Sequence, residues 1–113
     1  MNRTQFLTAA LVLCVSVPAS AEFLTGNDLL ERLRSKDEGA RVLALGYIMG
    51  ASDAGNTVNH CLPINATAGQ VRDVVYQWLE KTPSVRHHSA DSIVNAMLSM
   101  VYPCQGGAKK ENL

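Results

Sequence analysis

The sequence predicts an all-α protein, a small compact domain of four to five helices that is held by one disulfide. Apolar side chains recur at three- and four-residue spacing, helix-start signals precede these runs, and no useful stretch alternates as a strand would. With 113 residues, 47% of them hydrophobic and 18% charged, the chain suffices for one folded domain. Ten basic and ten acidic side chains, without a long basic run, argue against nucleic acid as a partner.

The first 21 residues have the pattern of a secretory signal peptide. A basic residue precedes an apolar run over residues 6–17, and Pro18 and small residues follow it up to Ala21. The run is about twelve residues long, whereas a membrane span needs about twenty. We therefore predict cleavage after Ala21 and export, with no membrane insertion of the mature chain. Cys14 lacks the small preceding residue of a lipidation site and is expected to leave with the signal.

The predicted mature chain, residues 22–113, begins with two helices. Thr25 and Asp28 have the spacing of a capping box, and three leucines on one face follow: Leu29, Leu30 and Leu33. Ser35 and Glu38 repeat the start signal and predict a second helix over residues 36–52.

Two faces of the second helix carry different patterns. One is the apolar stripe that we expect to pack on the core: Val42, Leu45 and Met49. The other repeats small residues every four positions: Gly46, Gly50 and Ala54. Because an interior glycine costs a helix about 1 kcal/mol relative to alanine, we expect another helix to approach this face closely.

Two further helices follow a loop over residues 55–65. Thr67 and Gln70 form the clearest capping box, and Pro83 ends the third helix. Its predicted core face is Val71, Val74, Val75, Trp78 and Leu79. Ser89 is the expected N-cap of the fourth helix, whose apolar residues are Ala90, Ile93, Val94, Met97, Met100 and Val101. Pro103 ends it, and residues 105–113 are expected to fray.

Cys61 and Cys104 are the two cysteines of the predicted mature chain. An even pair in a small exported domain is most simply explained by one disulfide. The bond would close a loop of about 43 residues, which corresponds to about 4 kcal/mol in the chain-entropy model. It would tie the loop before the third helix to the end of the fourth.

Candidate catalytic and metal-binding residues are few. His60 and Cys61, together with His87 and His88, lack the spacing of a zinc signature, and a thiolate would be consumed by the disulfide. Ser89 and Asp91 stand two apart on a helix and therefore point in different directions, which does not suit a hydrolytic triad. We predict no enzyme activity, no metal and no cofactor.

Segments along nearly the whole mature chain resemble the Rap/Tai family of periplasmic immunity proteins, some of which act against type VI secreted peptidoglycan amidases. The resemblance is carried by Leu24 to Leu30, Gly46 to Ala54, Cys61-Leu62-Pro63, Thr67 with Gln70, Pro83 to His87, Ala90 and Tyr102-Pro103-Cys104. It implies a helical domain, frequently a homodimer, that covers the active site of a secreted amidase without doing chemistry itself. A second disulfide of many relatives is absent, since Ser35 and Leu45 stand at those positions.

Two polar loops are the predicted partner-binding elements, because loops held by a disulfide or by packed helices can project rigidly into a cleft. Their candidate contact residues are Asn56, Asn59 and His60 in one, and Arg86, His87 and His88 in the other. Arg86 is the expected anchor, since arginine is enriched in interface hot spots. The alternative function is a small periplasmic structural or acid-stress chaperone-like protein, which can also be helical and held by one disulfide.

Overall fold

The computed structural model describes residues 23–105, so the predicted signal peptide and the tail residues 106–113 lie outside it. The described chain forms α1 (Gly26–Arg34), α2 (Glu38–Gly55), α3 (Ala68–Lys81), the short 3-10 helix η1 (Pro83–Val85) and α4 (Ala90–Val101). This part of the chain contains no named strand, and the predicted all-α class with four main helices is confirmed.

The helix starts follow from local side-chain chemistry. At α1, Thr25 Oγ1 accepts from the Asp28 N–H at 3.2 Å, and the Asp28 carboxylate accepts from the Thr25 N–H at 2.9 Å. Thr67 and Gln70 make the same reciprocal pair at α3. α2 begins later than predicted, because Asp37 is its N-cap and accepts from the Ala40 N–H at 2.9 Å.

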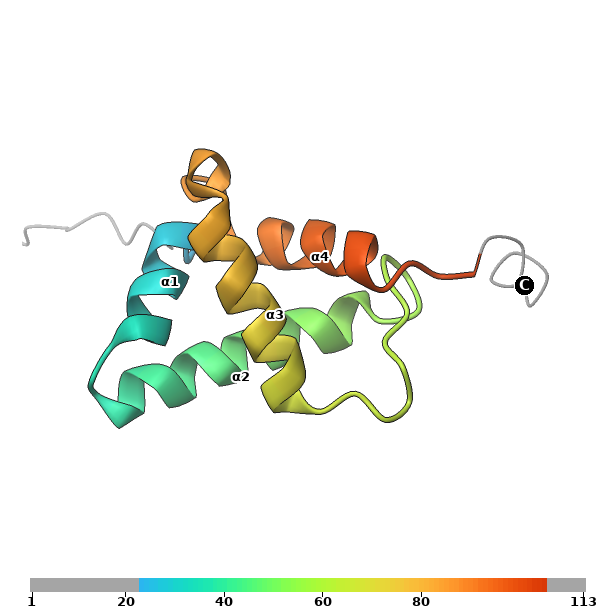
Figure 1. Cartoon of the computed structure of the whole chain (residues 1–113), viewed down its shortest axis with the longest axis horizontal. Coiled ribbons are helices and arrows are strands. Elements are labelled where there is room, and N and C mark those ends of the chain that lie inside the picture. Colours follow the sequence, from blue (N-terminus) through green and yellow to red (C-terminus); the bar gives the residue numbers. More distant parts are fainter. Residues whose placement is uncertain (1–22, 106–113) are drawn as a thin grey trace, which may run out of the picture.

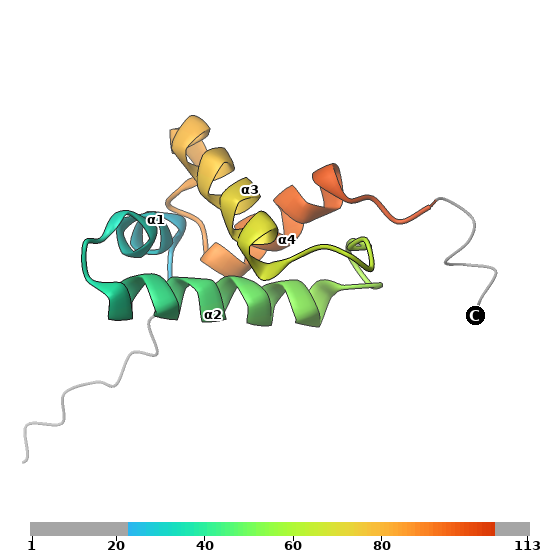
Figure 2. The ribbon, with the colours of Figure 1, turned by 60° about the horizontal axis from the view of Figure 1, so that its bottom comes forward.

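α2 forms one side of the molecule, and the other three main helices lie together on the opposite side of the core (Figures 1 and 2). α3 returns the chain from the C-terminal end of α2 toward α1, and α4 then runs back along α2 (Figure 1). The enclosed core consists of Leu29, Leu30, Ala44, Ile48, Val71, Val75, Leu79, Ala90, Ile93, Val94, Met97 and Leu98.

The inward face of α2 differs from the predicted one. Ala44, Ile48 and Ser52 are fully buried, whereas Val42 is 59% exposed. Leu45 and Met49 are only half-buried, at the flank of the helix. The small side chains face inward because they let the neighbouring helices approach α2 closely, which the larger stripe would prevent.

The expected close approach over Gly46 and Gly50 is also wrong. A Cβ atom placed at either position would meet nothing within 4 Å. Within α2, the glycine that permits a close approach is Gly55, at the end of the helix, where a Cβ would lie 2.7 Å from His60 Cε1 and would collide with Asn95 Oδ1.

The two C-terminal helices match their predicted faces except at four positions: Val74 and Trp78 are only partly buried, and Met100 and Val101 are exposed. Val71, Val75 and Leu79 are buried, while Trp78 packs against the core only partly buried. On α4, Leu98 is buried and Met100 is 63% exposed, because the last turn of the helix extends beyond the core.

The predicted disulfide is confirmed. Cys61 and Cys104 are bonded, with their Cα atoms 4.8 Å apart. The Cys61 N–H also donates to the Tyr102 carbonyl at 2.8 Å, so backbone and side chain together fix the loop to the end of α4.

Candidate partner-binding site

The loop after α2 makes a tight turn at Gly55. The N–H groups of Val58, Asn59 and His60 all donate to the Gly55 carbonyl, at 3.0, 2.8 and 3.3 Å. Thr57 sits at the turn with φ of 66°, the one positive φ of a non-glycine residue in the described range. A β-branched residue in the left-handed region is strained, and such strain often marks functional loops.

His60, one of the predicted contact residues, is buried and does not reach the surface of this loop. The ring is 0% exposed, and Nε2 lies 3.0 Å from the Ser52 carbonyl. A carbonyl only accepts, so Nε2 is the nitrogen that carries hydrogen in this contact. Ser52 O is one of the last four carbonyls of α2, which lack intrahelical donors, and His60 therefore caps the helix from inside.

Two buried side-chain atoms in this region have no hydrogen-bond partner. They are His60 Nδ1 and Asn95 Oδ1, and both groups crowd the position where Gly55 lacks a Cβ. The Asn95 amide nitrogen is engaged, since it donates to the Asp91 carbonyl at 3.0 Å.

Asn56 also serves the loop itself. Its side-chain oxygen accepts from the Leu62 N–H at 3.0 Å, across the base of the turn. Of the three predicted contact residues here, the structure leaves only Asn59 exposed with its neighbours Thr57 and Val58. The surface that this loop offers is therefore its tip, residues 57–59.

Arg86, in the second predicted loop, caps α3. Its Nε donates to the Leu79 carbonyl at 2.6 Å and its Nη2 donates to the Glu80 carbonyl at 2.7 Å. The side chain is half-buried between helix ends, and its own carbonyl accepts from the Asn27 N–H at 2.9 Å. Because its guanidinium is engaged in these two hydrogen bonds, Arg86 neither extends freely into solvent nor projects toward a partner.

His87 and His88 are exposed and adjacent. Their ring centroids lie 4.0 Å apart with the planes tilted by 37°. The backbone beneath them is fixed, since the His88 carbonyl accepts from the Gly26 N–H at 3.0 Å. Ser89 is the N-cap of α4 as predicted in position, but its hydroxyl donates to Ser92 Oγ instead of capping the backbone.

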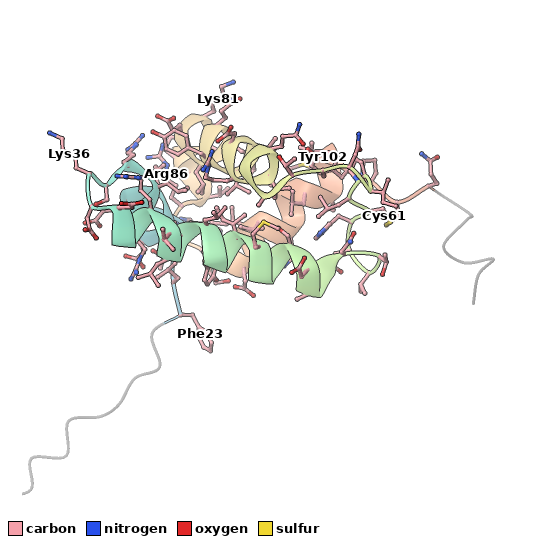
Figure 3. The ribbon with its side chains drawn as sticks, turned by 90° about the horizontal axis from the view of Figure 1, so that it is seen from below. Phe23, Lys36, Cys61, Lys81, Arg86 and Tyr102 are labelled. Atoms are coloured by element: carbon pink, nitrogen blue, oxygen red, sulfur yellow. A yellow bond between two sulfur atoms is a disulfide. The ribbon has the colours of Figure 1, made fainter. Side chains whose placement is uncertain are left out.

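The two loops lie at opposite ends of α4. Figure 3 shows Cys61 and Tyr102 close together at one end of the molecule and Arg86 at the other. α4 itself has 12 residues, which corresponds to a length of about 18 Å. The predicted contact residues therefore form two separate surfaces, the loop tip and the histidine pair.

Residues 23–105 hold no group of three or more His, Cys, Asp or Glu side chains placed to bind a metal ion. Cys61 is in the disulfide and has no thiolate. A groove of about 400 Å³ lies between α2 and α3 and includes Arg41, Arg72 and Tyr76 in its lining.

Residues 25–104 match the family model of the Rap1a immunity proteins. The chain belongs to this family. The match covers all four main helices, both loops and both cysteines of the disulfide. No curated protein matches the chain.

Membership in the Rap1a family implies an immunity function against a secreted effector, in which the protein acts as a non-catalytic inhibitor. Proteins of this family are typically periplasmic. None of the helices in the described part of this Rap1a protein is long and apolar enough to span a membrane.

The residues that sequence reasoning missed are those that fix the loops from inside. Asn95 was assigned no role, and Gly55 was treated only as the start of a loop. A glycine at a helix end followed five residues later by histidine is the only local signal of this packing.

Proposed function

We propose that this chain is exported to the periplasm, with its signal peptide cleaved after Ala21, and inhibits a secreted peptidoglycan amidase by occluding its active site. The Rap1a family match supports the immunity function, and the disulfide fits an oxidising compartment. We also propose, from the resemblance, that the protein is a homodimer.

The observation that carries the occlusion proposal is the construction of the loop tip, residues 57–59. A plug that enters a cleft must keep its shape, because ordering a flexible loop on binding costs affinity. Here three contacts below the tip hold its backbone: the buried His60 ring on the Ser52 carbonyl, the Asn56 side chain on the Leu62 N–H, and the Cys61–Cys104 disulfide. Thr57 also keeps a strained backbone conformation with a positive φ. Exposed Val58 and Asn59 give it an apolar and a hydrogen-bonding contact group.

The histidine pair is the second proposed contact surface. His87 and His88 project from a backbone fixed against α1, so they too reach solvent from a rigid support. A partner that touches both surfaces must span the length of α4.

Complex formation between the mature protein and candidate exported amidases tests this proposal. Size-exclusion chromatography should show a stable complex with a cognate amidase, whose activity on peptidoglycan is then lost. Asn59→Ala should raise the dissociation rate about tenfold, which corresponds to about 1.4 kcal/mol, and His88→Ala should raise it if the second surface also binds.

Gln77→Ala is the matched control, because Gln77 is exposed on α3 between the two loops. Its dissociation rate should equal that of the wild type. A tight complex that none of the loop substitutions weakens would show that the inhibitor binds through another surface. Failure of every candidate amidase to bind would contradict the choice of effector class.

A further inference from the structure

The Gly55 carbonyl is the point at which the loop tip, residues 57–59, is attached to the end of α2. Its oxygen accepts hydrogen bonds from three consecutive N–H groups, those of residues 58–60, at 3.0, 2.8 and 3.3 Å. The Thr57 N–H closes the other side of the turn by donating to the His60 carbonyl at 2.6 Å. Because these bonds hold the tip to one peptide group, a displacement of Gly55 would carry the tip with it.

Space, and not backbone conformation, requires glycine at position 55. No glycine of the described chain has a positive φ, so the backbone at Gly55 would accept an L side chain. The residue is buried, however, and a Cβ there would lie 2.7 Å from His60 Cε1 and would collide with Asn95 Oδ1. The end of α2 therefore rests directly against the Asn95 side chain of α4.

Asn95 is a fixed part of the α4 surface. Its amide nitrogen donates to the Asp91 carbonyl at 3.0 Å, one turn earlier in the same helix, which holds the side chain in one orientation. Its Oδ1 is buried and has no hydrogen-bond partner among the described residues. Burial of an amide oxygen without a donor costs stability, so hydrogen bonding does not explain why this oxygen faces Gly55. The amide does supply a side chain of fixed position against which the end of α2 can rest.

We propose that Gly55 and Asn95 are positioning residues for the loop tip, and that their contact sets the place of residues 57–59 relative to α4. A plug that enters a cleft must be held within a fraction of an ångström of its binding geometry, and this depends on the residues that support it. Neither residue needs to touch the effector, because Gly55 is buried and so is the Asn95 oxygen that meets it. The size of the side chains at positions 55 and 95 thus controls effector affinity from inside the molecule.

This inference rests on the proposed function, because it assigns the tip to the effector contact. The place of the tip, however, can be measured in the free mature protein by amide NMR. Gly55→Ala puts a methyl group against Asn95 Oδ1, so the N–H signals of residues 57–60 should shift and their hydrogen exchange should become faster. Asn95→Ala removes the contact without adding bulk and should change the same signals, so it serves even if Gly55→Ala does not fold.

Gly46→Ala is the matched control. It makes the same substitution on the same helix, but its methyl group enters open space, so the signals of residues 57–60 should stay as in the wild type.

The double variant, Gly55→Ala with Asn95→Ala, is the rescue. The new methyl group takes the space that the Asn95 amide leaves, which relieves the collision. The signals of residues 57–60 should therefore return toward their wild-type positions. Two substitutions that disturbed the fold independently would move these signals further from the wild type instead.

Dissociation rates of the amidase complex obtained by size-exclusion chromatography measure the effect on binding. Gly55→Ala should raise the rate about tenfold, and the double variant should recover most of this loss. In the Gly55→Ala background, Asn59→Ala should have little further effect, because a displaced tip has already lost that contact. His88→Ala, at the other end of α4, should have the same effect as in the wild type. A general loss of stability would not divide the two surfaces in this way.

The outcomes separate this inference from the proposed function. Unchanged signals of residues 57–60 in both Gly55→Ala and Asn95→Ala would overturn the positioning role, whether or not an amidase binds. A complex that dissociates at the wild-type rate despite a displaced tip would overturn the control of effector affinity. Failure of every candidate amidase to bind would overturn the proposed function and the effect on affinity, and the NMR spectra would then decide the positioning role alone.

Discussion

The loops at the two ends of α4 were predicted to play the same role, but they are built differently. The loop after α2 is fixed by side chains that enter the molecule: His60 under α2, Asn56 across the turn, and Cys61 in the disulfide. The loop before α4 is fixed mainly by its backbone, which pairs with the start of α1, and by Arg86. In both loops some of the polar side chains serve the fold, namely His60, Asn56 and Arg86. Asn59, His87 and His88, which have similar hydrogen-bonding groups, face solvent instead.

Removal of the disulfide should produce the largest difference in stability between the two loops. Cys61→Ser with Cys104→Ser should lower the free energy of unfolding by about 4 kcal/mol, because the unfolded chain regains the freedom of the closed loop. Urea denaturation of the oxidised and the substituted proteins measures the difference. Hydrogen exchange should rise first in residues 56–62, while residues 84–88 keep their protection. Equal loss of protection in both loops would mean that the disulfide holds the whole domain.

Substitution of His60 should come next. His60→Ala removes a buried ring and leaves the Ser52 carbonyl without its donor, so we expect a loss of about 3 kcal/mol in unfolding free energy. His88→Ala is the control from the other loop, because that ring is exposed and should cost less than about 0.5 kcal/mol. Thermal denaturation of the two variants, measured in parallel, checks this difference. If His88→Ala were the more destabilising change, then His88 and not His60 would be the residue that supports the fold.

Arg86→Met should cost about 1 kcal/mol. The change removes two charge-assisted hydrogen bonds to the end of α3, but the half-exposed carbonyls regain part of the loss from water. Denaturation measures this cost, and Arg86→Lys should recover less than half of it, since one ammonium does not reproduce the guanidinium's two parallel contacts. An Arg86→Met variant of unchanged stability would show that these contacts do not support the second loop.

Relief of the backbone strain at Thr57, in the loop after α2, should increase the stability of the protein. Thr57→Gly is expected to raise the free energy of unfolding by up to about 1 kcal/mol, because glycine adopts the left-handed backbone without steric cost. Ser84→Gly, at an exposed position without a positive φ, should be neutral or destabilising instead. Denaturation curves in which Thr57→Gly is destabilising would mean that the threonine side chain itself contributes more than the strain.

The smallest effect concerns pH at the start of α1, beside the second loop. Hydrogen bonds from Thr25 hold the pKa of the Asp28 carboxyl below its ordinary value, with Arg32 as a minor contribution. A lowered pKa means that ionised Asp28 stabilises the fold above the unfolded-state value of about 4 and that this contribution is lost as the pH falls through the folded-state value. Asp28→Asn should flatten the pH dependence of stability in that acidic range, and an unchanged profile would contradict the pairing.

Local sequence was sufficient for the helix order, the capping boxes and the disulfide. Thr25 with Asp28 and Thr67 with Gln70 act within three residues, so their geometry needs no knowledge of the rest of the fold. The cysteine pair was determined by count and compartment. The chain itself thus specified an all-α immunity-type domain with two loops beside α4.

Only the tertiary structure decided which side chains turn inward. His60 is polar and lies in a loop, which locally favours exposure, yet a bare Gly55 and an unsatisfied α2 carbonyl make the interior its better place. Arg86 likewise turns toward the end of α3, because the Leu79 and Glu80 carbonyls there accept hydrogen bonds from its guanidinium. The rotation of α2, with Ala44 and Ser52 inside and Leu43 outside, was set by how closely the neighbouring helices pack. Such choices depend on groups distant in sequence that compete for the same buried space, and a local pattern does not contain them.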